Sequence, residues 1–154
     1  KKATVEDNTR EFLDNVFAAM NLKVEIAIQY NKEEGNMAID LEGPEMGVLI
    51  GKRGQTLDSL QYLVSLVVNK DSEYYIRVKL DTENYRERRK ETLEHLAKNI
   101  AYKVKRTKKS VSLEPMNPYE RRVIHSTLQN NAYVTTHSEG DEPYRRVVIE
   151  LKKA

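Results

Sequence analysis

Residues 49–66, LIGKRGQTLDSLQYLVSL, constrain the fold of this chain more than any other stretch. Gly51 and Gly54 bracket two cations, Lys52 and Arg53, and a helical stripe of apolar residues follows at once. Glycine permits a tight turn and a close approach of the backbone to another surface. Exposed amides at a helix start, with cations beside them, favour an anion such as phosphate. An ordinary surface loop is the alternative interpretation, because G-x-x-G alone is a weak pattern.

The periodicity of the apolar residues places this turn inside a small α+β domain. A helical spacing predicts helices over residues 4–20 and 55–69, and a short helix over 45–50. Alternation of apolar and polar residues predicts strands over 24–30, 36–42 and 73–81, the first two joined as a hairpin. The expected order is helix, strand, strand, helix, turn, helix, strand, with helices covering one face of the sheet.

The second half of the chain reads as a long basic helix followed by a smaller α+β domain. Residues 82–108 keep a helical period, and a segment with two prolines, SLEPMNP, ends it. Pro118 suits the first turn of a new helix capped by Asn117, which we expect to run to about residue 130 with Tyr119, Val123, Ile124 and Leu128 facing inward. Strands are expected over 132–137 and 144–151. We therefore predict two domains, residues 1–81 and 82–154.

Charge is unevenly distributed although the net charge is only +2 over 154 residues. Residues 1–50 carry 5 basic and 10 acidic groups, whereas residues 83–125 carry 12 basic and 6 acidic groups. A positive field in the middle of the chain suits a polyanion. Without cysteine there are no disulfides or thiolate metal sites. We see no signal peptide and no membrane-spanning run, and a first residue Lys1 leads us to interpret the sequence as a fragment.

The predicted order of elements around the GKRG turn resembles the type II K homology family, which binds single-stranded nucleic acid. In that family the loop clamps the backbone of about four nucleotides, beside an apolar groove that takes the bases. The resemblance carries the phosphate contacts to Gly51, Lys52, Arg53 and Gly54. It places Val48, Leu49, Ile50 and Leu57 near the groove, some of them as core residues.

A second motif, NPYERRVIH, puts Arg121 and His125 four residues apart on one helix face. By itself the pair is a weak signal, since a solvated helix face explains it more often than a binding site does. Together with YVTTHSEGDEPYRRVVIELK, it resembles the small domain family named for its Arg-xxx-His pair, which also binds single-stranded nucleic acid. The resemblance implies that Arg121 and His125 contact phosphate, and Arg145 and Arg146 on the last strand are less direct candidates.

The two domains in this order resemble the bacterial Jag family over nearly the whole chain. That resemblance implies a non-catalytic, cytoplasmic protein that binds single-stranded RNA, or single-stranded DNA, and acts as a post-transcriptional regulator linked to cell elongation and division. It implies pairing with a small K homology protein or a homodimer through the K homology domain. It also implies association with a sporulation-stage membrane insertase, without insertion into the membrane. No cofactor or metal is expected.

The remaining basic, aromatic and histidine residues indicate a function less clearly than the two motifs do. The basic run 103–110 is either a solvated helix end or a nucleic-acid contact. One or both of Tyr74 and Tyr75 are expected to fill the sheet rather than to stack on bases, and His95 and His137 are expected to be ordinary packing or surface residues. No carboxylates stand at metal-ligand spacing, which disfavours a nuclease. The remaining alternative is a protein-interaction scaffold that uses the acidic N-terminal third, with RNA binding secondary.

Overall fold

The computed structural model describes residues 3–153, and the chain divides into two compact units, residues 1–86 and 87–154. Each unit contains a three-stranded sheet and a hydrophobic core of its own. The α+β class predicted from the periodicity is therefore confirmed.

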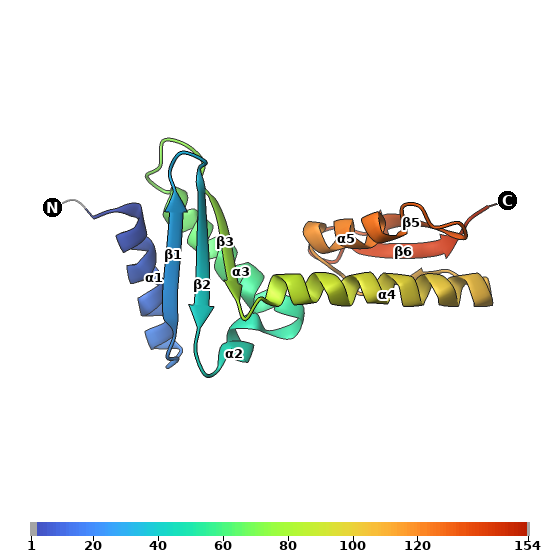
Figure 1. Ribbon diagram of the computed structural model, residues 1–154, viewed down its shortest axis with the longest axis horizontal. Coiled ribbons are helices and arrows are strands. Elements are labelled where there is room, and N and C mark those ends of the chain that lie inside the picture. The colour runs from blue at the N-terminus through green and yellow to red at the C-terminus, as the bar shows by residue number, and fades with distance from the viewer. Residues whose placement is uncertain (1–2, 154) are drawn as a thin grey trace. The chain divides into compact units, whose positions relative to one another are not determined.

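The first unit contains the elements in the order that the sequence predicted (Figure 1). They are α1 (Val5–Ala19), β1 (Glu25–Asn31), β2 (Asn36–Glu42), α2 (Met46–Ile50), the 3-10 turn η1 (Lys52–Gly54), α3 (Gln55–Asn69) and β3 (Arg77–Thr82). β1 and β2 form the expected antiparallel hairpin, and β3 pairs in parallel with β2. The sheet order is β1-β2-β3.

The core of the first unit lies on one face of this sheet. Residues alternate between buried and exposed along β2 and β3, as expected when only one face is covered. The covering side chains come from α1, α2 and α3; the buried ones are Leu13, Phe17, Met46, Leu49, Leu57, Leu60, Val64 and Val68. α3 is thus held firmly against the sheet, and this fixes the position of the turn at its N-terminus.

The segment before β3 corrects one prediction. Tyr74 and Tyr75 are 77% and 73% exposed, so they do not fill the sheet. The reason is the side chain of Asn69 at the end of α3, whose Oδ1 accepts from the Ile76 N–H at 2.7 Å and whose Nδ2 donates to the Ile76 carbonyl at 2.9 Å. These two bonds align the chain only from Ile76 onward, and the preceding tyrosines remain in an exposed loop.

The second unit is built on the long helix α4 (Tyr85–Thr107). β4 (Val111–Ser112), α5 (Pro118–Leu128), β5 (Val134–Glu139) and β6 (Arg146–Leu151) follow, in an antiparallel sheet of order β4-β6-β5. Leu93, Ala97, Ala101 and Val104 of α4 pack against Ile124 and Ile149 and their neighbours, and Figure 1 shows β6 alongside the helix. The two-residue strand β4 was not predicted, because it is too short to show a period.

The start of α5 confirms the predicted cap. The Asn117 side chain accepts from the Glu120 N–H at 2.8 Å, the Glu120 carboxylate accepts from the Asn117 N–H at 3.2 Å, and Pro118 is the first helical residue. Glu120 is also paired with Arg89 of α4 at 2.7 Å. Tyr119 is 50% exposed, contrary to prediction, because the cap turns Glu120 rather than its neighbour toward α4.

Candidate nucleic-acid interface

The GKRG turn joins α2 to α3 through backbone conformations that glycine favours. Gly51 has φ 70° and Gly54 has φ 75°. A Cβ at Gly51 would lie 2.2 Å from Thr56 Oγ1, and a Cβ at Gly54 would lie 2.6 Å from the Tyr85 ring. Both positions therefore require glycine for steric and conformational reasons together. The glycines were predictable from the sequence, whereas the side chains that press on them, Thr56 and Tyr85, were not.

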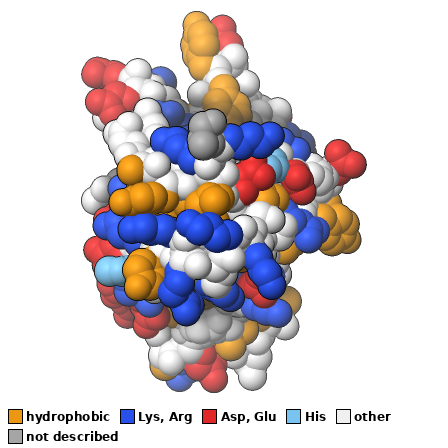
Figure 2. Space-filling model, turned by 90° about the vertical axis from the view of Figure 1, so that its right-hand side faces the viewer, with side chains coloured by type: hydrophobic (Ala, Val, Ile, Leu, Met, Phe, Trp, Pro, Cys, Tyr) orange, Lys and Arg blue, Asp and Glu red, His pale blue; other side chains and the backbone are white. Residues whose placement is uncertain are grey.

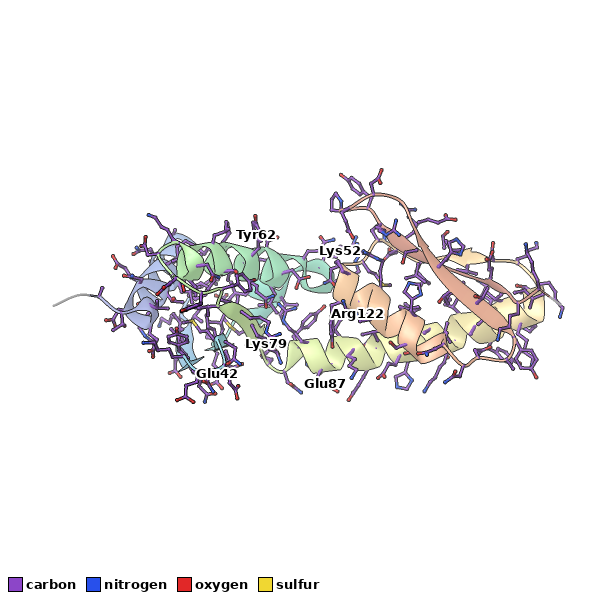
Figure 3. The ribbon with its side chains drawn as sticks, turned by 90° about the horizontal axis from the view of Figure 1, so that it is seen from above. Glu42, Lys52, Tyr62, Lys79, Glu87 and Arg122 are labelled. Atoms are coloured by element: carbon purple, nitrogen blue, oxygen red, sulfur yellow. The ribbon has the colours of Figure 1, made fainter. Side chains whose placement is uncertain are left out.

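The two cations of the turn are not equivalent. Lys52 is exposed, and its side chain extends from the turn before α3 (Figure 3). Arg53 is half-buried, has a left-handed backbone with φ 53°, and takes part in a further interaction within the described chain. Of the two cations, Lys52 is the more exposed to solvent. A ligand phosphate would meet Lys52 as a mobile charge and Arg53 as a partly fixed one.

The start of α3 lies directly behind the turn. Gly54 occupies the N-cap, and within residues 3–153 no side chain caps the helix. The first amides of a helix carry partial positive charge and attract anions. Asp58, the one acidic residue of the first turn of α3, is paired with Arg86 at 2.7 Å. The turn therefore combines helix-start amides with the two cations.

The apolar residues around the turn divide into core and surface. Leu49 and Leu57 are fully buried, so Leu57 cannot be the base-contacting residue expected from the sequence; it anchors α3 to the sheet. Ile50 is half-buried and Val48 is 54% exposed. Of these four residues, only the last two leave apolar surface beside the turn for a ligand.

Arg121 on α5 is buried, with 8% of its surface exposed, although the family resemblance implied that it contacts phosphate. Its Nη1 donates to the Met116 carbonyl at 2.6 Å, and its Nη2 forms an ion pair with Glu142 Oε1 at 2.6 Å. Arg121 thus ties α5 to the segment before it and to the turn between β5 and β6. Its guanidinium is engaged inside the protein.

His125 points the same way as Arg121, toward β5. Nδ1 lies 2.7 Å from Thr136 Oγ1, and Nε2 lies 2.9 Å from Ser138 Oγ. Burial lowers the pKa of His125, and the nearby charge of Arg121 and then of His137 lowers it further. The ring is therefore held neutral and braces α5 against β5. Thr136 and Ser138, two apart on one strand face, are partners that sequence reasoning did not name.

Arg145 immediately precedes β6 and Arg146 is its first residue, and both are half-buried. Arg145 Nη1 donates to the Gly140 carbonyl at 2.7 Å, and Arg146 Nη2 donates to the Tyr144 carbonyl at 3.3 Å. A guanidinium has five N–H donors. Each of these arginines therefore keeps donors for another ligand, in contrast to the buried Arg121.

A pocket of about 570 Å³ in the first unit has the opposite charge. It lies where β2 and β3 end and is lined by Asp40, Glu42, Gly43, Asp81, Glu83 and Asn84. Four carboxylates repel phosphate, so a nucleic acid on this unit would avoid this end of the sheet. Across the described residues, no group of three or more His, Asp or Glu side chains is placed to hold a metal ion.

Comparison with known proteins agrees with the division of the chain into these two units. The model of the KhpA/KhpB KH domain matches residues 6–80, and that of the Arg-xxx-His (R-3-H) domain matches residues 91–151. The RNA-binding protein KhpB of Clostridium symbiosum is 70% identical over 153 residues, which cover 99% of this chain and 69% of that protein. The chain belongs to the KhpB family.

Other KhpB relatives are more distant. The RNA-binding protein KhpB of Bacillus subtilis is 40% identical over 92% of this chain and 68% of its own length. That of Lactiplantibacillus plantarum is 36% identical over 99% of this chain but only 48% of its own length. The predicted resemblance to the Jag family, whose members are also named KhpB, is confirmed. None of the helices described in this KhpB-family chain combines the length and apolarity needed to cross a membrane.

Proposed function

We propose that this chain is a non-catalytic protein that binds single-stranded RNA, with single-stranded DNA as a weaker ligand. The observation that carries the proposal is the GKRG turn: two sterically required glycines place Lys52, Arg53 and the uncapped start of α3 together. Such a turn lets a sugar–phosphate backbone come close to protein amides. The names of the KhpB relatives, each an RNA-binding protein, support the same ligand.

In this proposal the first unit grips the backbone. Phosphates lie against Gly51, Lys52, Arg53 and Gly54, and bases reach the apolar surface of Ile50 and Val48. In the second unit, Arg145 and Arg146 supply additional phosphate contacts. Arg121 and His125 act indirectly, because their polar atoms already hold α5 to β5 and to the turn after it.

Charge reversal at Lys52 tests the proposal. Lys52→Asp should weaken binding of a short single-stranded RNA and flatten the slope of log K against log salt by about 0.7, the contribution of one phosphate contact. Lys52→Asp with Arg53→Asp should weaken RNA binding further. Because Arg53 already interacts within the protein, the double variant also disturbs that interaction, and the single variant is easier to interpret.

Lys32→Asp, at an exposed position in the turn between β1 and β2, makes the same charge change as a control. It should bind RNA like the wild type, and the RNA recovered from every mixture should keep its length. Equal affinities and salt slopes for Lys52→Asp and Lys32→Asp, both folded, would refute the phosphate role of the turn.

A second proposal concerns pairing with another K homology domain, either a small K homology protein or a second copy. It is supported by the outer face of α3. Tyr62 there (labelled in Figure 3) is 64% exposed, and Leu63 and Leu66 are 47% and 53% exposed. Apolar side chains grouped on one helix face commonly mark an interaction surface. Leu66→Lys should reduce the dimer fraction in analytical ultracentrifugation, whereas Gln29→Lys, at an exposed position on β1 away from this helix face, should not.

If protein contacts through this face proved to be the main activity, the chain would be an interaction scaffold with RNA binding secondary. An RNA ligand and a chain without cysteine favour the cytoplasm. A regulatory role in cell elongation and division remains part of the proposal through the family resemblance alone.

A further inference from the structure

The last turns of α4 carry a dense positive charge that neither motif explains. Residues 95–113 contain six Lys or Arg residues and no Asp or Glu; the cations are at positions 98, 103, 105, 106, 108 and 109. All six are exposed. The four within α4 face solvent because Ala97, Ala101 and Val104 turn the other side of the helix into the core, and the last two follow the end of the helix. The helix dipole accounts for cations in the last turn only. Figure 2 shows lysine and arginine side chains interspersed with hydrophobic ones across the face in view.

Tyr133, in the loop before β5, is fixed against this part of α4. Lys105 Nζ lies 3.8 Å from the centroid of its ring. The backbone of Tyr133 is held from both sides: its N–H donates to Asn131 Oδ1 at 2.8 Å, and its carbonyl accepts from the Lys152 N–H at 2.8 Å. Even so, Tyr133 is 50% exposed. It is an aromatic ring held in place with half its surface open to solvent.

Tyr102 extends the same surface along the helix. It is 66% exposed, and it precedes Lys105 by three residues and Arg106 by four, so these side chains are neighbours on the helix surface. Lys98, four residues earlier, continues the row. We call Lys98, Tyr102, Lys105, Arg106 and Tyr133 the tyrosine–lysine patch.

The aromatic residues of the patch distinguish between two kinds of polyanion. Among residues 87–153, every large hydrophobic side chain that is exposed is a tyrosine: Tyr102, Tyr119, Tyr133 and Tyr144. Surfaces that enter a lipid headgroup region present Leu, Phe or Trp beside their cations. Rings interspersed with cations instead match single-stranded nucleic acid, whose bases stack on aromatic side chains while its phosphates meet Lys and Arg.

We propose that the tyrosine–lysine patch is a separate binding surface for single-stranded RNA, on which bases stack against Tyr102 and Tyr133. Lys98, Lys105 and Arg106 meet the adjoining phosphates. The proposal rests on the proposed function, RNA binding, but it assigns a surface outside the GKRG turn and outside the Arg121 and His125 pair. Because Tyr133 is already ordered, stacking on it requires little further loss of conformational freedom.

The test uses the full chain with Lys52→Asp as background, so that the patch accounts for more of the remaining affinity. Tyr102→Ala with Tyr133→Ala should weaken binding of a short single-stranded RNA about tenfold or more for each ring that stacks. Tyr102→Phe with Tyr133→Phe keeps both rings and should retain most of the affinity. Tyr144→Ala, which removes another exposed tyrosine of the same unit, is the matched control and should have no effect.

A second experiment tests the proposed contacts between the patch and RNA phosphates. Lys105→Gln with Arg106→Gln should flatten the slope of log K against log salt by about 1.4, for two lost contacts. Ultraviolet crosslinking of wild-type protein to RNA, followed by mass spectrometry, should mark Tyr102 or Tyr133. Thermal unfolding of each variant confirms that loss of binding is not loss of fold.

The outcomes distinguish a failure of the proposed function from a failure of the tyrosine–lysine patch as an RNA surface. If wild-type protein binds no RNA, the proposed function fails. If wild-type protein binds RNA but the alanine, phenylalanine and Tyr144→Ala variants all bind equally, the GKRG turn stands and the patch is not an RNA surface. Sedimentation with phosphatidylserine vesicles that depends on Tyr102 and Tyr133, without RNA binding by the patch, would also overturn the inference.

Discussion

Gly51 differs from Gly47, four residues earlier, in what surrounds its α-carbon. The space where a Cβ would stand at Gly51 is filled by Thr56, whereas at Gly47 no described atom beyond its own helix and chain neighbours lies within 4 Å of that position. Gly51 also has φ 70°, and Gly47 lies inside α2. The same substitution should therefore have opposite effects at the two positions.

We expect Gly51→Ala to destabilise the first unit by more than about 1 kcal/mol, because alanine resists a positive φ and its methyl group displaces Thr56. Gly47→Ala should be neutral or stabilising by up to about 1 kcal/mol, because glycine is a poor helix former. Urea unfolding of the two variants measures both effects. Equal stabilities would mean that the turn relaxes freely.

His125 makes the stability of the second unit depend on pH. Its pKa in the folded protein is lowered from the ordinary value of 6.5, chiefly by burial. Between the two pKa values the unfolded chain binds the proton and the folded chain does not. The stability that the neutral ring supports is therefore fully present above pH 6.5, declines below it, and is lost once the pH has fallen through the folded pKa.

His125→Gln should remove this part of the pH dependence. The measurement is the unfolding midpoint at a series of pH values from neutral to mildly acidic. His95→Gln replaces an exposed histidine and controls for the number of histidines. A profile for His125→Gln that falls in acid as steeply as the wild type would show that the ring is not held neutral by its surroundings.

At the scale of elements, α5 depends on side chains that reach beyond it. Arg121 and His125 lie on one face of the helix, as their spacing predicted, but the face is covered by β5 and the turn that follows. In this protein the side chains of the Arg-xxx-His pair hold α5 against β5 and against the turn that follows β5. The outward positions of α5 are held by other residues, among them Arg122.

Arg121→Ala should destabilise the protein by about 1 to 3 kcal/mol, because the Met116 carbonyl loses its donor and Glu142 its partner. Arg121→Lys should recover only part of this, since an ammonium cannot reproduce two bonds of a planar guanidinium. Arg122→Ala, at the exposed neighbouring position, should change stability by less than about 0.5 kcal/mol. Thermal unfolding compares the three variants, and equal losses at both arginines would argue against the brace.

At the scale of the whole molecule, the position of charge matters more than its sum. The net charge is +2, yet residues 1–50 are acidic and residues 95–113 carry six cations without a carboxylate. A polyanion responds to the local field that it meets, which screening confines to about 8–10 Å at physiological salt. Two chains of equal net charge can therefore differ widely in RNA affinity.

A charge exchange tests this statement. Lys105→Glu combined with Glu33→Lys leaves the net charge unchanged, and Glu33 is an exposed residue in the turn between β1 and β2. The exchange should weaken RNA binding as much as Lys105→Glu alone, and Glu33→Lys alone should have little effect. Affinities measured at two salt concentrations decide it. Full recovery of affinity in the double variant would mean that net charge governs binding.

Much of the fold follows from local signals in the sequence. The helical and alternating periods, the Asn117 and Pro118 cap and the glycines of the GKRG turn are properties of short segments. Apart from the short strand β4, the order of the elements was therefore predictable, and their bounds were predictable to within a few residues. One local signal gave a wrong prediction: Tyr74 continues the alternation of Ile76 and Val78, but the side chain of Asn69 fixes the chain only from Ile76 onward.

The candidate site depended more on tertiary structure. Sequence alone determined that Lys52 and Arg53 follow a glycine at a helix start, and that Arg121 and His125 share a helix face. Only the packing decided that Arg53 is half-buried, that Leu57 is core, and that the face of Arg121 and His125 is covered. The physical reason is that a helical period shows which side chains point together, whereas burial depends on which distant segment lies against them, as Tyr133 does against Lys105.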